Sequence, residues 1–247
     1  MIKKFRNYNG GCASCNLAFT LAEVLVTLGI IGVVAAMTMP ALIKNHQRQT
    51  YIKQLHKIYN EFQQGLDMKM LETNAVNLAE AGFVRNNEFN VEKQFLQSHF
   101  KVVNDCGVDN QSCFASSYKG LNGSIGSPSF AGYSVSIASG ASISFYIDGL
   151  DTGDENTDDY LGYIYVDTNG ANGPNIGGRD LFRMYVYADG VIDDYHINPA
   201  CRKNNNCVDG SDATEARENN FNRYCADAGD TDGCFGKILN DGWQMTY

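Results

Sequence analysis

The chain has 247 residues, of which 44% are apolar and 19% are charged. This balance is typical of a globular protein and argues against wholesale disorder. Lys and Arg number 19 against 28 Asp and Glu, for a net charge of −9, so no broad basic face for nucleic acid is expected. Eight cysteines favour an oxidising compartment.

A basic leader precedes a long apolar segment. Residues 1–18 contain three basic residues and no acid, and the run FTLAEVLVTLGIIGVVAAMTM then occupies residues 19–39. At about 1.5 Å per residue, a helix of this length spans roughly 30 Å, the thickness of a bilayer core. Basic residues before the run predict a cytoplasmic N-terminus. An uncleaved signal anchor or an ordinary secretory signal is the plainer alternative.

Glu23 is the single charged residue within this run. A carboxylate inside a spanning helix costs about 2.5–3.5 kcal/mol on insertion scales. One interpretation places Glu23 near the helix end, where it reaches the membrane interface. The other supplies a cation within the membrane: cleavage between Ala18 and Phe19 would create an α-amine that can approach Glu23 of a neighbouring helix.

The segment AFTLAEVLVTLGIIGVVAAMTMP resembles the class III signal of type IV prepilins and type II secretion pseudopilins. The resemblance covers roughly residues 17–45, and Ala18 stands where the family usually has Gly. It implies cleavage before Phe19 by a prepilin peptidase, methylation of the new amine, and alignment of subunits by Glu23. The matching residues are Ala18 and Phe19 for processing, and Thr20, Leu21, Glu23 and Pro40 for assembly.

The resemblance also implies a role and a location. The chain would be a structural subunit of a type IV pilus or a type II secretion pseudopilus, with the inner-membrane assembly platform, the lipid bilayer and other pilin subunits as partners. It would lie in the bacterial inner membrane before assembly and in a periplasmic or extracellular filament afterwards. A pilus, a secretion pseudopilus and a DNA-uptake filament share this N-terminus. A calcium-stabilised membrane-anchored or minor-pilin surface adhesin is the alternative.

The rest of the chain predicts a stalk and a head. After a membrane helix at 19–39, apolar residues at three- and four-residue steps predict an amphipathic stalk over 40–80, with Pro40 bending the helix. The stripe consists of Ile43, Tyr51, Leu55, Ile58, Tyr59, Phe62, Leu66 and Met70. The head, residues 81–247, has a short helical pattern at 86–100 and period-two alternation at 131–138, 141–148, 160–166 and 181–187. We therefore expect an α+β fold in which the long helix packs on an antiparallel sheet, as in pilins.

One loop of the head is rich in oxygen ligands. The segment VDTNGANGPNIGGRDLF threads five oxygen-bearing side chains on glycines: Asp167, Asn169, Asn172, Asn175 and Asp180. Flexible, oxygen-rich loops suit Ca²⁺, which takes about six to eight oxygen ligands. The run resembles a segment of some bacterial pilin-like proteins and the calcium loops of major pseudopilins. The alternative is a structural turn, which uses the same residue types.

A second acidic stretch lies nearby, and enzyme motifs are missing. Six carboxylates within 148–159 predict a solvated loop or a cation shared with the loop at 167–180; they are Asp148, Asp151, Asp154, Glu155, Asp158 and Asp159.

The sequence has no Gly-x-Ser-x-Gly, His-Glu-x-x-His or phosphate-binding loop, so we do not expect an enzyme.

The cysteines predict disulfides. Removing Cys12 and Cys15 with the leader leaves six of the eight, and outside the membrane these should oxidise. Local pairing is favoured, although spacing alone leaves other connectivities open. The favoured pairs are Cys106 with Cys113, Cys201 with Cys207, and Cys225 with Cys234. The polar segment 201–234 has few apolar residues, so we expect disulfides to hold it in place of a core.

Overall fold

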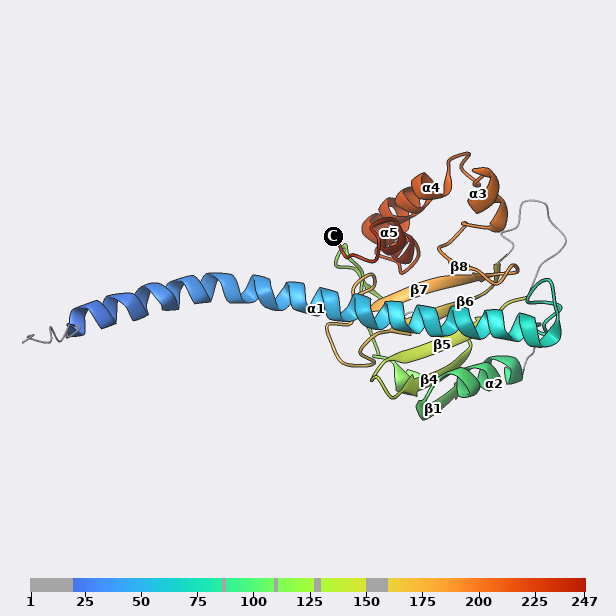
Figure 1. The fold of residues 1–247 in the computed structure, drawn as a ribbon, viewed down its shortest axis with the longest axis horizontal. Helices are drawn as coiled ribbons and strands as arrows, with labels where there is room; N and C mark the ends of the chain where they lie inside the picture. Colours follow the sequence, from blue (N-terminus) through green and yellow to red (C-terminus); the bar gives the residue numbers. More distant parts are fainter. Residues whose placement is uncertain (1–19, 86–87, 109–110, 127–129, 150–159) are drawn as a thin grey trace, which may run out of the picture. The chain divides into compact units, whose positions relative to one another are not determined.

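A computed structural model describes residues 20–85, 88–108, 111–126, 130–149 and 160–247. The chain divides into two compact units, Met1–Asn45 and His46–Tyr247. The first contains the N-terminal half of helix α1. The second contains the rest of α1 and all other described elements (Figure 1). From here on, the head means this second unit, residues 46–247.

The fold is α+β with a long N-terminal helix, as expected. The helices are α1 (Leu21–Thr73), α2 (Asn90–His99), α3 (Pro199–Asn204), α4 (Ala213–Asn220) and α5 (Cys234–Asn240), with a short 3₁₀ helix η1 (Gln111–Cys113) and a π-helix η2 (Phe221–Ala228). The strands are β1 (Val102–Val108), β2 (Tyr118–Lys119), β3 (Ile125–Gly126), β4 (Tyr133–Ile137), β5 (Ser142–Ile147), β6 (Tyr160–Asp167), β7 (Leu181–Tyr187) and β8 (Ile192–Asp193).

The main sheet is an antiparallel meander. Its six strands follow the order β1-β4-β5-β6-β7-β8, and β2 and β3 form a separate hairpin. The four alternating segments of the sequence are the central strands β4 to β7, which confirms that prediction. The edge strand β1 was not predicted, because its side chains are mostly exposed and follow no regular alternation.

Within the head, α1, α2 and α5 contribute buried residues to the core on one face of the sheet (Figure 1). Inward residues of β4 to β7 join the predicted helical stripe, of which Leu55, Ile58, Phe62 and Leu66 are buried. α2 packs beside α1 on this face because Gly65 leaves room for it: a side-chain carbon there would lie 2.9 Å from the ring of Phe95. Gly65, which has a low intrinsic helix propensity, thus allows α1 and α2 to pack closely.

α1 passes through Pro40 without interruption and ends at Thr73, earlier than the predicted residue 80. Asn74, which follows, takes a left-handed backbone conformation with φ of 53°, a common way to end a helix. Turns then lead to α2.

The predicted disulfides Cys201–Cys207 and Cys225–Cys234 form in the segment 201–234, but the expectation that they replace a core there is only partly right. Phe221 within the segment, and Phe235 and Ile238 just after it, are buried in the cluster that contains α1 and the sheet. Buried polar groups also attach it: Arg217 on α4 pairs with Asp193 on β8 at 2.6 Å. Few apolar residues are needed, because each of these three is almost fully buried.

Candidate functional site

The N-terminal half of α1 is an apolar helix that contacts no other element among the described residues of its own unit. Large apolar residues from Leu21 to Ile43 are between 44% and 80% exposed. α1 contains a stretch long and apolar enough to cross a membrane, and none of that stretch is buried. An uncovered helix of this composition requires lipid or other helices around it.

A capping box begins this helix. The Glu23 carboxylate accepts hydrogen bonds from the backbone N–H and the hydroxyl of Thr20, both at 2.9 Å. The Glu23 N–H in turn donates to the Thr20 hydroxyl at 3.2 Å. This reciprocal pair satisfies free donors at the helix start. The T-x-x-E spacing is visible in the sequence, but the interpretation of Glu23 as an intersubunit charge overlooked it. Ala18 and Phe19, the predicted processing residues, lie outside the described part of the chain.

The oxygen-rich loop connects β6 to β7 and is anchored by two buried carboxylates. Asp167 ends β6, and its carboxylate accepts from the Tyr118 hydroxyl at 2.5 Å and the Asn169 N–H at 3.2 Å. Asp180 precedes β7 and accepts from the N–H groups of Asn175 at 2.7 Å and Ile176 at 2.6 Å. These bonds are what a structural turn requires, so both carboxylates have partners without a metal ion.

Burial leaves both carboxylates poorly solvated. It raises the pKa of Asp167 to about 7, although the Tyr118 hydrogen bond acts in the opposite direction; the nearby charge of Asp180 raises it further. Burial likewise raises the pKa of Asp180, against four backbone hydrogen bonds that lower it. Two neighbouring buried carboxylates repel each other, and a bound cation would relieve that repulsion.

Three further oxygen atoms in the same loop are buried and have no hydrogen-bond partner among the residues that the structure describes. They are the side-chain oxygens of Thr168, Asn169 and Asn175. The Asn169 amide nitrogen is occupied, since it donates to the carbonyls of Asn172 at 2.6 Å and Gly173 at 3.0 Å. Asn172 is exposed and donates back to the Asn169 carbonyl at 2.9 Å. Buried oxygens without donors are costly unless a cation or water satisfies them.

Four of the five predicted ligands therefore have buried side-chain oxygens in this loop, namely Asp167, Asn169, Asn175 and Asp180, and Thr168 adds a buried hydroxyl that the sequence did not suggest. Within the described residues, no group of three or more His, Cys, Asp or Glu could hold a metal ion. A cation here would thus depend on amide, hydroxyl and carbonyl oxygens, which Ca²⁺ accepts readily.

Three disulfides tie the head together. They join Cys106 to Cys113, Cys201 to Cys207 and Cys225 to Cys234, which are the local pairs that the sequence favoured. The third lies in the main core, and the first belongs to a smaller cluster that includes Phe130 and Tyr165.

Of the second acidic stretch, the structure describes Asp148, which pairs with Arg85 at 3.4 Å; the other five carboxylates lie outside the described residues.

A polar cluster that the sequence did not reveal lies on the sheet face opposite α1. Arg183 of β7 donates from Nη1 to the Asp232 carboxylate at 3.2 and 3.3 Å. Its guanidinium lies 4.1 Å from the ring centre of Tyr163 and 5.0 Å from that of Tyr185. The Tyr185 hydroxyl also donates to Asp232 at 2.9 Å. The cluster joins residues far apart in the chain, so no local pattern could predict it.

Comparison of the chain with protein-family models, with curated proteins and with solved structures finds no match.

Proposed function

We propose that this protein is a structural subunit of a type IV pilus-like or type II secretion pseudopilus-like filament. The observation that carries the proposal is an exposed apolar helix that begins with a carboxylate in the T-x-x-E motif and continues into a disulfide-bonded head. Before assembly, lipid covers the helix, and in the filament sister helices replace the lipid. No catalytic step is needed for this role.

The assembly step gives Glu23 a second partner. After cleavage before Phe19, the new α-amine and the Glu23 carboxylate of an adjacent subunit are opposite charges in a low-dielectric environment. Such a pair is favourable when both charges would otherwise stay unpaired in lipid. It sets the axial stagger between neighbouring helices. The Thr20 capping bond holds the carboxylate near the helix start, where an amine can reach it.

Processing is tested by the mass and N-terminal sequence of the protein purified from cells that carry prepilin peptidase. The mature chain is expected to begin at Phe19, because the small residue Ala18 and the following motif match the cleavage signal. A catalytically inactive peptidase is the control and should leave the leader in place. A mature chain that begins at Met1, or between residues 30 and 45, would contradict the proposal.

We also propose that the loop at 167–180 binds Ca²⁺, as the alternative function of a calcium-stabilised surface adhesin requires. The unpartnered buried oxygens of Thr168, Asn169 and Asn175 favour this over a purely structural turn. Two buried carboxylates supply the negative charge. Burial raises the pKa of Tyr51 on α1, and the charges of Asp180 and Asp167 raise it further.

Calcium should raise the melting temperature of the full chain in detergent micelles. Ligand present at about 100 times its Kd stabilises the folded state by about 2.7 kcal/mol. The double variant Asp167→Asn, Asp180→Asn should lose this response, whereas the matched variant Asp148→Asn should keep it. An unchanged melting temperature on adding Ca²⁺ after treatment with a chelator would assign the loop to turn formation alone.

A further inference from the structure

The Cys225–Cys234 disulfide packs directly against the oxygen-rich loop. It joins η2 to the first residue of α5, and both cysteines are fully buried. A side-chain carbon at Gly178 of the loop would lie 2.9 Å from the Cys234 sulfur atom and 3.0 Å from the Cys225 sulfur atom. This position has no room for a side chain, so the loop backbone lies against the two sulfur atoms.

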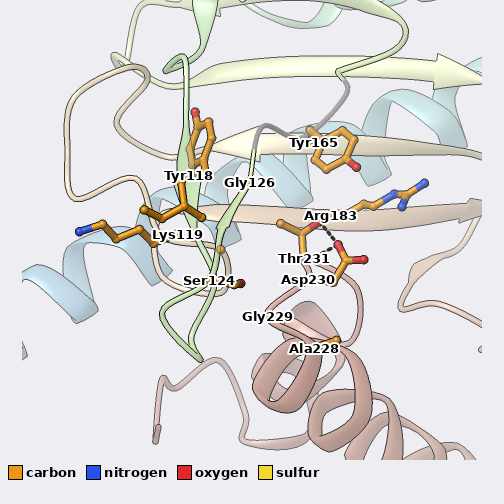
Figure 2. Close-up of a pocket in the computed structure, with 13 residues that line it drawn as sticks. Tyr118, Lys119, Ser124, Gly126, Tyr165, Arg183, Ala228, Gly229, Asp230 and Thr231 are labelled. Atoms are coloured by element: carbon orange, nitrogen blue, oxygen red, sulfur yellow. Dashed lines mark hydrogen bonds between the residues drawn. The ribbon is translucent and has the colours of Figure 1, made fainter.

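The segment that this disulfide closes makes a second contact with the same backbone. A side-chain carbon at Gly177 would lie 3.2 Å from the methyl carbon of Thr231. The turn that carries Thr231 is ordered by a hydrogen bond of its own, because the Thr231 N–H donates to the Asp230 carboxylate at 2.6 Å (Figure 2). The disulfide and the segment it closes thus support two consecutive residues of the loop.

Gly178 lies between two of the candidate cation ligands. Asn175 precedes it, and Asp180 follows it. The Asp180 carboxylate accepts from the N–H groups of Asn175 and Ile176. The Gly178 N–H donates to the Leu181 carbonyl at 2.8 Å. Residues 175–181 therefore form one hydrogen-bonded turn, and a shift of Gly178 would move the ligands on both sides of it.

The last residue of the chain supports the loop at the same point. The Tyr247 hydroxyl donates to the Gly178 carbonyl at 2.8 Å. The Tyr247 ring centre lies 4.7 Å from that of Phe221, which begins η2, the element that carries Cys225. The C-terminal segment therefore holds Gly178 by a hydrogen bond as well as by the contact with the disulfide.

The Cys201–Cys207 disulfide provides a comparison within the same segment. It lies in a small cluster with Ile197 and Ala216. That cluster includes no residue of the loop at 167–180. The two C-terminal disulfides therefore differ in one respect that can be tested, which is contact with the oxygen-rich loop.

We propose that the Cys225–Cys234 disulfide positions the oxygen-rich loop for Ca²⁺, so that the loop binds the cation tightly only in the oxidised chain. The inference rests on the calcium site proposed above. When the disulfide forms, the two thiols pass two electrons and two protons to a disulfide oxidant, which becomes a dithiol. Calcium would then bind after export to an oxidising compartment. Because coupling between two equilibria is reciprocal, bound Ca²⁺ should also protect this disulfide against reduction.

An alanine at Gly178 tests the contact without removing a cysteine. Its methyl group would press on both sulfur atoms, and φ is 77° there. Gly210→Ala is the matched control, because φ is 80° and the added carbon would meet nothing within 4 Å. Calorimetric titration of the full chain in micelles with CaCl₂ should show a Kd weakened by about fivefold or more in Gly178→Ala, and an unchanged Kd in Gly210→Ala. A Gly178→Ala variant that binds as tightly as the unmodified protein would overturn the proposal.

A second measurement uses the unmodified protein. The full chain in micelles is equilibrated with dithiothreitol, either with a calcium chelator or with saturating CaCl₂, and thiol labelling with peptide mapping gives the reduced fraction of each disulfide. Ca²⁺ should lower the equilibrium constant for reduction of Cys225–Cys234 by about fivefold or more and leave that of Cys201–Cys207 unchanged. Equal protection of both disulfides, or protection of neither, would count against the coupling.

Paired serine variants complete the test. Cys225→Ser with Cys234→Ser should bind Ca²⁺ about fivefold more weakly or worse, whereas Cys201→Ser with Cys207→Ser should bind as the unmodified protein does. Melting curves establish that each variant is folded. If the unmodified, oxidised protein gives no calcium signal, the calcium site itself fails and this proposal fails with it. Calcium binding that is the same in every variant would remove the coupling and leave the calcium site in place.

Discussion

Replacing Glu23 by either Ala or Gln is expected to leave membrane insertion intact and to remove the subunit from filaments. The two variants separate the two roles of this residue. Gln can still accept from Thr20 and complete a capping box, whereas Ala cannot. Neither can pair with the α-amine of a neighbouring subunit. Leaving one member of a buried ion pair alone costs about 3–5 kcal/mol, so incorporation should fall by roughly two to three and a half orders of magnitude in both variants.

The measurement is the amount of subunit in sheared filaments relative to the amount in membranes extracted with alkali. Thr20→Ala is the matched control, because it removes a cap worth about 1 kcal/mol but keeps the carboxylate. We expect this variant to assemble far better than either Glu23 variant. Normal incorporation of Glu23→Gln would show that capping, and not charge pairing, is what assembly needs from this position.

The second large effect concerns Phe62, which connects the helix to the head's core. Phe62 is fully buried, and its ring centre lies 4.8 Å from Phe100, 5.4 Å from Phe95 and 5.6 Å from Phe145. It therefore joins α1 to the α2 region and to β5. Phe62→Ala removes this contact and leaves a cavity, at a cost of about 3–5 kcal/mol in the free energy of unfolding.

Thermal unfolding of the full chain in micelles, without reductant, measures this cost. At about 2–4 °C per kcal/mol for a domain of this size, the midpoint should fall by roughly 6–20 °C. Leu71→Ala is the matched control, because Leu71 lies on the same helix but is 80% exposed. Its effect should stay within about 0.5 kcal/mol. Equal effects of both substitutions would show that the stripe of α1 does not pack as described.

The sequence predicted the elements whose side chains alternate regularly. The period of two identified β4 to β7, since successive side chains of a strand point to opposite faces of the sheet. The three- and four-residue steps identified the buried face of α1, because burial of one face of a helix imposes that period. The edge strand β1 was missed, since exposed residues such as Val103 follow no such constraint. The contribution of Phe235 to the core was missed because a few apolar residues in a polar segment carry no periodic pattern.

The candidate sites divide along the same line. The T-x-x-E motif that we propose for assembly lies within four consecutive residues, so it could be identified from the sequence, although the capping role of Thr20 was overlooked. The oxygen-rich loop is also a local feature of the sequence. The choice between a structural turn and a cation site, however, depends on which of its side-chain oxygens are buried and which of them accept a hydrogen bond. The cluster of Arg183, Asp232 and Tyr185 unites strands and a C-terminal loop, and only tertiary structure brings them together.

We propose that the apolar half of α1 packs against copies of itself in the filament, and a single cysteine on that helix would report this packing by cross-linking. Val33 is 57% exposed, and Val33→Cys in a chain with Cys12 and Cys15 replaced by Ser would provide a single free thiol, because the other six cysteines are paired in disulfides. Mild oxidation of membranes from cells that carry the assembly platform should then yield covalent dimers, and adding Glu23→Ala should abolish them. A Val33→Cys chain that stays monomeric where filaments form, or that cross-links equally without Glu23, would contradict the account.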